Sequence, residues 1–200
     1  TLDDAATHEV EARHAQILRC GTHVSTHLDA PYHAIPDGKK IDELPLEHLC
    51  GNAVKLRIPD GRTKDSPLDA ADFADFAEKD TVEKLVIETG WAKATWGTVD
   101  YFTEGPNITR DAARELASWP KLHLIAMDFP NIDSKAETVM GKPNPNHVIL
   151  LGREILLLEN LVRLEECPDH FFLSSPPPKL VGGDGCPCRA VAMFPSPFPG

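Results

Sequence analysis

The residues best suited to carry out chemistry lie in one short segment near the start of the chain. Three of the nine histidines, His23, His27 and His33, fall within eleven residues, and Asp29 lies among them. Imidazole nitrogens and a carboxylate oxygen form a ligand set that suits Zn²⁺ or Mn²⁺ and leaves coordination positions open for water. The segment is therefore predicted to bind a divalent metal ion.

The spacing of these residues restricts the backbone conformation. On a helix, His23 and His27 would share a face, but Asp29 would point elsewhere. Pro31 would also end such a helix. On a straight strand all four side chains would share a face, yet His23 and His27 would lie roughly 13 Å apart at about 3.3 Å per residue. The backbone must therefore bend near residues 25–26 if both imidazoles are to reach one ion.

The alternative is that these histidines are structural. Isolated histidines usually lie at the surface or form hydrogen bonds in the core, and two histidines four positions apart occur on many helices. Three histidines and an acid in one register form a stronger pattern. Spacing alone leaves both interpretations open and favours metal binding.

The same segment resembles a known family. Residues 23–33 read His-Val-Ser-Thr-His-Leu-Asp-Ala-Pro-Tyr-His. The metal-dependent cyclase hydrolases, which include bacterial kynurenine formamidase and isatin hydrolase, have the pattern His-x-Gly-Thr-His-x-Asp-x-Pro-x-His. Ser25 stands where the family has glycine, which leaves the shape of the loop open. The likeness continues in the family's order from about Cys20 onward, at residues 89–91, 96–102, 106, 128, 131–133, 159–161 and 183–190.

The resemblance implies further ligands far along the chain. In the family a histidine is followed twelve residues later by a glutamate, and His147 and Glu159 have that separation. By resemblance, His147 and Glu159 would hold one metal. The other would be held by His23 and His27, with Asp29 bridging the two, so that one or two Zn or Mn ions are expected. Without the resemblance, His147 and Glu159 would each be interpreted as structural.

The resemblance also gives His33 a role as the catalytic acid/base. An imidazole with an unperturbed pKa near 6.5 can take a proton from water and return it to the departing atom, which is worth roughly 10²–10⁴ in rate. A divalent ion lowers the pKa of a bound water from 15.7 to about 7 and polarises a carbonyl. This combination suits hydrolysis of an amide or lactone. The spacing of His33 also allows it to be a third metal ligand.

Aromatic residues are candidates for the substrate pocket. Tyr32, Trp91 and Trp96 can wall an aromatic substrate, although such residues more often belong to the core. Tyr32 and Trp91 are the substrate-binding residues that we predict.

Other chemistries have weaker support. The sequence lacks Gly-x-Ser-x-Gly, GxxxxGK[ST] and a GxGxxG after a strand, which disfavours α/β-hydrolase, phosphoryl-transfer and dinucleotide chemistry. The glycine-rich residues 182–185 are interpreted as a turn first and as a loop near a site second. Cys186 and Cys188 suggest a redox or zinc role, but one intervening residue would strain a disulfide and a single pair makes a poor zinc site.

The elements that must position these residues alternate between strands and helices. Strands are predicted at 53–58, 84–88 and 122–127, and shorter ones at 171–173 and 189–194. Helices are predicted to begin after Ser66 and after Thr109, the second running to about Ser118. This order predicts an α/β fold with a mixed, partly barrel-like sheet and flanking helices. The resemblance implies the swivelling β/β/α fold of the family.

Length and charge restrict the partners. The 200 residues fit a single domain over 1–200, and Thr1 in place of Met suggests that a native N-terminal segment is missing. A net charge of −11 disfavours nucleic acid. No apolar run of about 18 residues and no secretory signal is present, so we expect no membrane partner. Five dispersed cysteines fit a reducing, cytoplasmic location.

Together these features predict a metal-dependent amidohydrolase. It would cleave a carbon–nitrogen bond of a small, aromatic amide, formamide or cyclic imide/lactam by means of a metal-activated water. The alternatives are a lactone hydrolase of the same family and a catalytically silent metal-binding scaffold. By resemblance the protein is expected to be a homo-oligomer.

Overall fold

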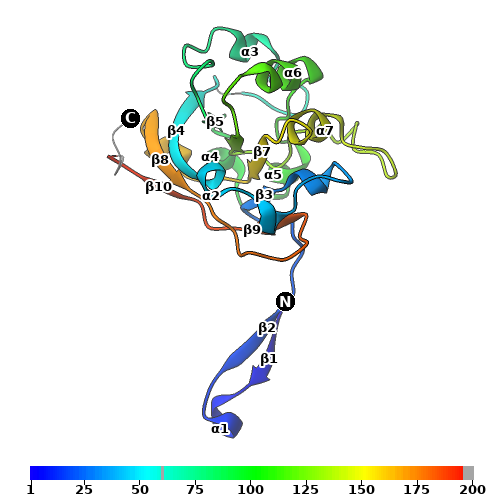
Figure 1. The fold of residues 1–200 in the computed structure, drawn as a ribbon, viewed down its shortest axis with the longest axis vertical. Coiled ribbons are helices and arrows are strands. Elements are labelled where there is room, and N and C mark those ends of the chain that lie inside the picture. Colours follow the sequence, from blue (N-terminus) through cyan, green and yellow to red (C-terminus); the bar gives the residue numbers. More distant parts are fainter. Residues whose placement is uncertain (60, 196–200) are drawn as a thin grey trace.

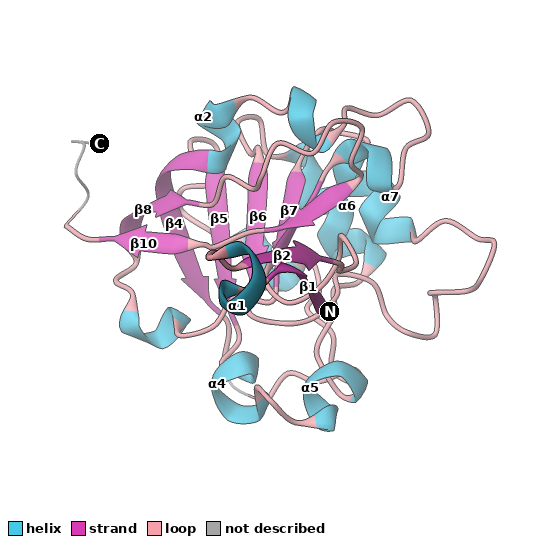
Figure 2. Cartoon of the chain, turned by 90° about the horizontal axis from the view of Figure 1, so that it is seen from below, coloured by secondary structure: helices cyan, strands magenta, loops and turns pink. Residues whose placement is uncertain are grey.

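The fold is organised around a mixed β-sheet (Figures 1 and 2). The structure, a computed structural model, describes residues 1–59 and 61–195. Within these residues eight strands follow the order β10-β8-β4-β5-β6-β7-β3-β9. The central strands are parallel and are β4 (Cys50–Arg57), β5 (Lys84–Glu88), β6 (Leu124–Met127) and β7 (Leu156–Glu159). The predicted α/β fold with a mixed sheet is confirmed.

Antiparallel strands extend the sheet at both edges. On one side β8 pairs with β4 and β10 pairs with β8, and on the other β3 pairs with β7 and β9 pairs with β3. Their bounds are β8 (His170–Ser174), β10 (Val191–Met193), β3 (His27–Asp29) and β9 (Gly185–Pro187). The two C-terminal strands therefore lie at opposite edges, which gives the sheet its half-barrel character.

Both faces of the central strands are buried. Along β5, Leu85 and Ile87 belong to one hydrophobic cluster and Val86 belongs to the other. Successive side chains of a strand point to opposite faces, so a strand covered on both sides is a continuous apolar run. This explains why 84–88 and 122–127 could be recognised as buried strands.

Helices cover one of these faces. Side chains from α3 (Ala71–Ala74), α6 (Arg110–Ser118) and α7 (Pro145–Leu151) join the cluster that contains Leu85 and Ile87. Further helices are α2 (Leu46–Leu49), α4 (Trp91–Thr95) and α5 (Val99–Thr103). None of the helices in the described part of the chain has the length and hydropathy needed to cross a membrane.

The two predicted helix starts have different outcomes. The Thr109 hydroxyl accepts a hydrogen bond from the Ala112 amide, so α6 begins as predicted and ends at Ser118. The predicted start after Ser66 is wrong. Leu68 instead forms a β-bridge with Ile108, so that α3 begins only at Ala71. A tertiary contact here overrides a local capping signal.

The N-terminal segment forms a hairpin that projects from the rest of the chain (Figure 1). β1 (Leu2–Ala6) pairs antiparallel with β2 (Ala15–Leu18), and α1 (His8–Glu11) lies between them. Of its side chains only Ala6 is buried. The hairpin contributes nothing to the two hydrophobic clusters.

Candidate metal centre

The candidate site forms where β3 lies beside β7. His27, the first residue of β3, is paired with Glu159, the last residue of β7. Residues directly opposite in an antiparallel pair share a face of the sheet. His27 Nε2 accordingly lies 3.6 Å from Glu159 Oε2 and 3.3 Å from Asp29 Oδ1. Strand register thus brings together residues that are 132 positions apart.

A bend before β3 sets the orientation of His27. Ser25 has φ of 56°, in the left-handed region that favours glycine. Its carbonyl accepts a hydrogen bond from His27 Nδ1 at 2.9 Å, which leaves Nε2 facing the carboxylates. The predicted bend near residues 25–26 is confirmed. Its geometry also explains why the family pattern has glycine at this position.

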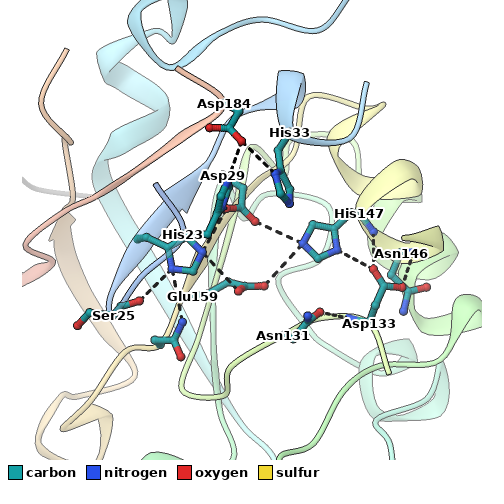
Figure 3. A network of polar contacts seen from close by, with 12 residues as sticks. His23, Ser25, Asp29, His33, Asn131, Asp133, Asn146, His147, Glu159 and Asp184 are labelled. Carbon is teal, nitrogen blue, oxygen red and sulfur yellow. Dashed lines mark hydrogen bonds and ion pairs between the residues drawn. The ribbon is translucent and has the colours of Figure 1, made fainter. Parts of the chain in front are cut away.

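His23 reaches the same centre from the other side of the bend. Its Nδ1 lies 2.6 Å from Asp29 Oδ1 (Figure 3). Gly185 on β9 makes this approach possible, because a Cβ atom there would lie only 2.6 Å from His23 Cε1. The absence of a side chain at residue 185 is therefore a requirement of the site.

His147 approaches from the first turn of α7. Its Nδ1 lies 2.6 Å from Asp133 Oδ2, and its Nε2 lies 3.4 Å from Asp29 Oδ2 and 3.9 Å from Glu159 Oε1. Asp133 also accepts hydrogen bonds from the backbone amides of Asn146 and His147. A buried carboxylate thus orients this imidazole toward the centre, a frequent arrangement around metal-binding histidines.

His33 lies at the rim, on the 3-10 turn η1 (Pro31–His33). Its ring centroid is 3.9 Å from that of His23 and 5.4 Å from that of His147. Ligand atoms of His23, Asp29 and His33 all lie within 4.8 Å of one another. This geometry keeps open both roles considered for His33, acid/base and third ligand.

Asp29 occupies the middle of the cluster. Ligand atoms of His27, Asp29 and Glu159 also lie within 4.8 Å of one another, so that Asp29 belongs to both compact groups. This grouping differs from the partition that the resemblance implies, in which Glu159 pairs with His147. It preserves the central position of Asp29, whose side chain is 1% exposed.

One cavity of about 460 Å³ contains all six of these side chains. They are His23, His27, Asp29, His33, His147 and Glu159. Phe102 and Pro130 add an apolar wall. Tyr32 and Trp91 do not line this cavity, and Trp91 lies instead in a separate cavity of about 530 Å³ at the ends of β4 and β5. Their role in substrate binding stays a prediction.

Burial and charge shift the pKa values of the cluster strongly. Burial lowers the pKa of His147, but its hydrogen bond to Asp133 and its close contact with Asp29 outweigh burial and raise the pKa to about 10. His23 rises to a pKa of about 9, since Asp29 and Asp184 outweigh its burial. Burial, together with the charge of Asp29, raises the pKa of Glu159. In the protein alone, protons on histidines thus balance the buried carboxylates.

The net pKa shift of His33 is in the opposite direction. Burial lowers the pKa of this imidazole, and the charges of His23 and His147 lower it further against the pull of Asp29. His33 is therefore held neutral at neutral pH. A neutral imidazole can accept a proton.

The residues present fit a divalent cation. Asp29 Oδ2 and Glu159 Oε1 are buried without a hydrogen-bond partner among the described residues. Buried carboxylate oxygens without partners are costly, and a cation among them would satisfy both. Imidazole and carboxylate are also the donors that Zn²⁺ and Mn²⁺ accept.

Sequence reasoning missed three residues around the cluster. Asp133 supports His147, Phe102 forms part of the cavity wall, and Asp184 contacts His23. Asp133 and Asp184 belong to stretches that resemble the family, so a signal was present at both. Phe102 ends the stretch 96–102, which also resembles the family, so a signal was present there too.

The cysteine alternative finds little support. Cys186 lies in β9 and is buried, and all five cysteines are free thiols. Burial raises the pKa of Cys186, and raises that of Cys188 to about 12. Since the thiolate is the reactive form, these residues are poorly suited to redox chemistry.

Sequence comparison identifies relatives of this chain. The family described as putative cyclase matches residues 2–134. The kynurenine formamidase of Salinibacter ruber is 32% identical over 183 residues, covering 87% of this chain and 77% of that protein. The kynurenine formamidase of Geobacillus thermodenitrificans is 31% identical over 175 residues, with the same shares.

Structural comparison gives the same grouping. An isatin hydrolase bound to the product analogue thioisatinate has a TM-score of 0.79 and 25% identity, covering 98% of this chain and 81% of that one. Isatin hydrolase A of Labrenzia aggregata, bound to benzyl benzoate, has a TM-score of 0.79 at 24% identity, covering 96% and 82%. These likenesses confirm the predicted cyclase-like fold.

Proposed function

Because the chain belongs to the cyclase family, we propose that it is a metal-dependent hydrolase cleaving a carbon–nitrogen bond of a small amide. An N-formyl aromatic amine and a cyclic imide or lactam are the preferred substrate classes. The names of its relatives support this choice, since a formamidase and an isatin hydrolase both act on amide bonds. The observation that carries the proposal is the pair of buried carboxylate oxygens, from Asp29 and Glu159, that have no hydrogen-bond partner within the described part of the chain.

The side chains that would hold the cation come from four parts of the chain. We assign this role to His23, His27, Asp29, His147 and Glu159. When bound, a divalent cation lowers the pKa of water to about 7 and polarises a carbonyl oxygen. Zn²⁺ and Mn²⁺ both suit these donors.

His33 would move the proton that the reaction requires. Its Nδ1 faces Asp184, at 3.5 Å, so Nε2 is the nitrogen free to act. As the oxygen of water bonds to the carbonyl carbon, Nε2 takes the proton that water loses. It then gives this proton to the nitrogen as the carbon–nitrogen bond breaks, which releases a carboxylic acid and an amine.

The cavity would orient the substrate. Phe102 and Pro130 offer an apolar surface for an aromatic ring. Asn131, Asn144 and Asn160 also line the cavity and supply polar groups for the amide. Such positioning places the carbonyl near His33 and excludes part of the surrounding water.

Purified protein stripped with a chelator and reloaded with Zn²⁺ or Mn²⁺ tests the proposal. We expect hydrolysis of an N-formyl aromatic amine or isatin, and little hydrolysis of a simple lactone. His33→Ala should lower kcat by roughly 10²–10⁴ while the metal content, measured by elemental analysis, stays unchanged. His170→Ala is the matched control, since this histidine is exposed and distant from the cavity lining.

Three results would contradict the proposal in different ways. Preferred turnover of the lactone would indicate lactone hydrolysis. A protein at full metal occupancy with no activity on any of these compounds would indicate a scaffold. Loss of metal in His33→Ala would make His33 a ligand rather than the acid/base.

A further inference from the structure

The glycine-rich loop at residues 183–185 packs directly against the candidate site. The Ala30 amide donates to the Asp184 carbonyl at 3.0 Å, and the Ile41 amide donates to the Gly183 carbonyl at 2.9 Å. β9, which begins at Gly185, then pairs with β3. The loop is therefore part of the wall around His23 and His33, beyond the turn expected from its composition.

One carboxylate on this loop faces two imidazoles (Figure 3). Asp184 Oδ2 lies 3.0 Å from His23 Nε2 and 3.5 Å from His33 Nδ1. The two rings are themselves in contact, with centroids 3.9 Å apart. An acceptor between two imidazoles favours a proton on each facing nitrogen.

In both rings the nitrogen that contacts Asp184 is the one directed away from the centre. His23 turns its other nitrogen, Nδ1, toward Asp29 at 2.6 Å. The outer nitrogen of His147, Nδ1, faces Asp133 in the same way, and the outer nitrogen of His27, Nδ1, faces the Ser25 carbonyl. Each of the four imidazoles thus has an acceptor on its outer nitrogen, and for His33 that acceptor is Asp184.

We propose that Asp184 is a positioning residue that holds His33 in the Nδ1–H tautomer. This inference rests on the proposed function, in which His33 Nε2 must offer a lone pair to take a proton from water. In the other tautomer Nε2 already carries hydrogen and cannot accept one. Through its second contact Asp184 also fixes the ring of His23, so that it couples a metal ligand to the acid/base.

The contribution of the side chain can be separated from folding of the loop. The loop is anchored by backbone bonds to Ala30 and Ile41, by the ladder with β3, and by the Gly182 amide, which donates to Asp42 Oδ1 at 2.9 Å. None of these contacts uses the Asp184 carboxylate, whose side chain is 37% exposed. Asp184→Asn therefore should leave the loop in place.

The test compares Asp184→Asn with Asp42→Asn in Zn²⁺-loaded protein. For Asp184→Asn we expect kcat to fall about 10–100-fold with KM changed less than about twofold. In spectra of ¹⁵N-labelled imidazoles, the His33 signal should shift from the Nδ1–H pattern to a mixture of tautomers. Asp42→Asn, which alters the same loop away from the imidazoles, should change neither measurement.

A double-mutant cycle shows whether Asp184 acts through His33. In a His33→Ala background, Asp184→Asn should cost less than threefold further activity. A full additional loss there, or an unchanged His33 tautomer in Asp184→Asn, would overturn the inference. If the wild type hydrolyses nothing, the proposed function fails, but the ¹⁵N spectra still decide whether Asp184 sets the tautomer.

Discussion

Ser25 shows how one residue shapes the candidate centre. Its φ of 56° costs a residue with a Cβ roughly 1–2 kcal/mol, a strain that glycine avoids. Glycine loses more chain entropy on folding, by about 0.4–1 kcal/mol. We expect Ser25→Gly to raise the free energy of unfolding by up to about 1 kcal/mol in urea titrations, with metal affinity unchanged.

The matching change, Ser25→Val, tests the same backbone conformation with a residue that disfavours it. A β-branched residue fits the left-handed region poorly, so we expect at least about 1 kcal/mol of lost stability and weaker metal binding. Wild-type behaviour of Ser25→Val would mean that the bend adopts a different geometry in solution.

Asp133 supports His147 from outside the cavity. It is buried, and its Oδ2 lies 2.6 Å from His147 Nδ1. Such supporting carboxylates are worth about 10–100-fold in metal affinity. We expect that loss in Asp133→Asn, measured by competition with a chelator for Zn²⁺. The exposed Asp111→Asn serves as the control, and equal affinities in the two variants would remove Asp133 from the site.

At the level of elements, the sequence predicted correctly the strands and helices whose formation depends on nearby residues. The strand at 84–88 and the helix capped by Thr109 follow from an apolar run and a side-chain hydrogen bond, both readable in a few residues. The start after Ser66 failed because Leu68 pairs with Ile108, forty positions away. The sequence contains no sign of that partner.

The same division applies to the site. Residues 23–33 could be recognised as one ligand group, because their spacing is short and their types are distinctive. His147 and Glu159 were found only through resemblance to a family, since their convergence depends on strand pairing. Asp184 went unassigned because its approach follows from β9 joining β3.

Lys84 at the start of β5 allows a test of element stability. Its side chain is buried, and among the residues that the structure describes the nearest carboxylate oxygen, on Glu83, lies 3.7 Å from Nζ. Burial lowers the pKa of Lys84, so the charged form destabilises the folded state at any pH below that lowered value. We expect Lys84→Met to raise the free energy of unfolding by roughly 1 kcal/mol at pH 7.

The pH dependence of that difference has a definite sign. As pH rises from the lowered folded pKa toward the unfolded value of 10.5, wild-type Lys84 loses its charge and the cost disappears. The advantage of Lys84→Met over wild type should therefore shrink in urea titrations at higher pH. Exposed Lys121→Met should differ from wild type by less than about 0.5 kcal/mol throughout. A less stable Lys84→Met at pH 7 would contradict this account.

At the scale of the whole molecule, metal binding should be visible as stability. Zn²⁺ at 100 times its Kd adds about 2.7 kcal/mol, which raises Tm by about 5–10 °C in a chain of this size. Thermal unfolding with Zn²⁺ and with chelator measures the difference. Glu159→Gln should reduce the Zn²⁺-dependent rise in Tm. A wild-type Tm that does not change when Zn²⁺ is added would exclude a metal centre.

The exposed hairpin bears on assembly. Leu2 of β1 lies opposite Leu18 of β2, and both are exposed. A lone two-stranded hairpin is marginally stable in water, which favours the expected homo-oligomer. Light scattering should give a multiple of 21.9 kDa. A mass equal to one chain at micromolar concentration would contradict the expectation.

The distribution of the site along the chain has a consequence for biosynthesis. Its first imidazoles leave the ribosome more than 110 residues before His147, and the strand that carries Gly185 follows later still. A nascent chain therefore holds an incomplete set of the proposed donors until Glu159 has been made. The proposed metal centre can therefore form only after Glu159 has been made, and a product that stops before β9 would lack the strand that pairs with β3 even where its central strands have assembled.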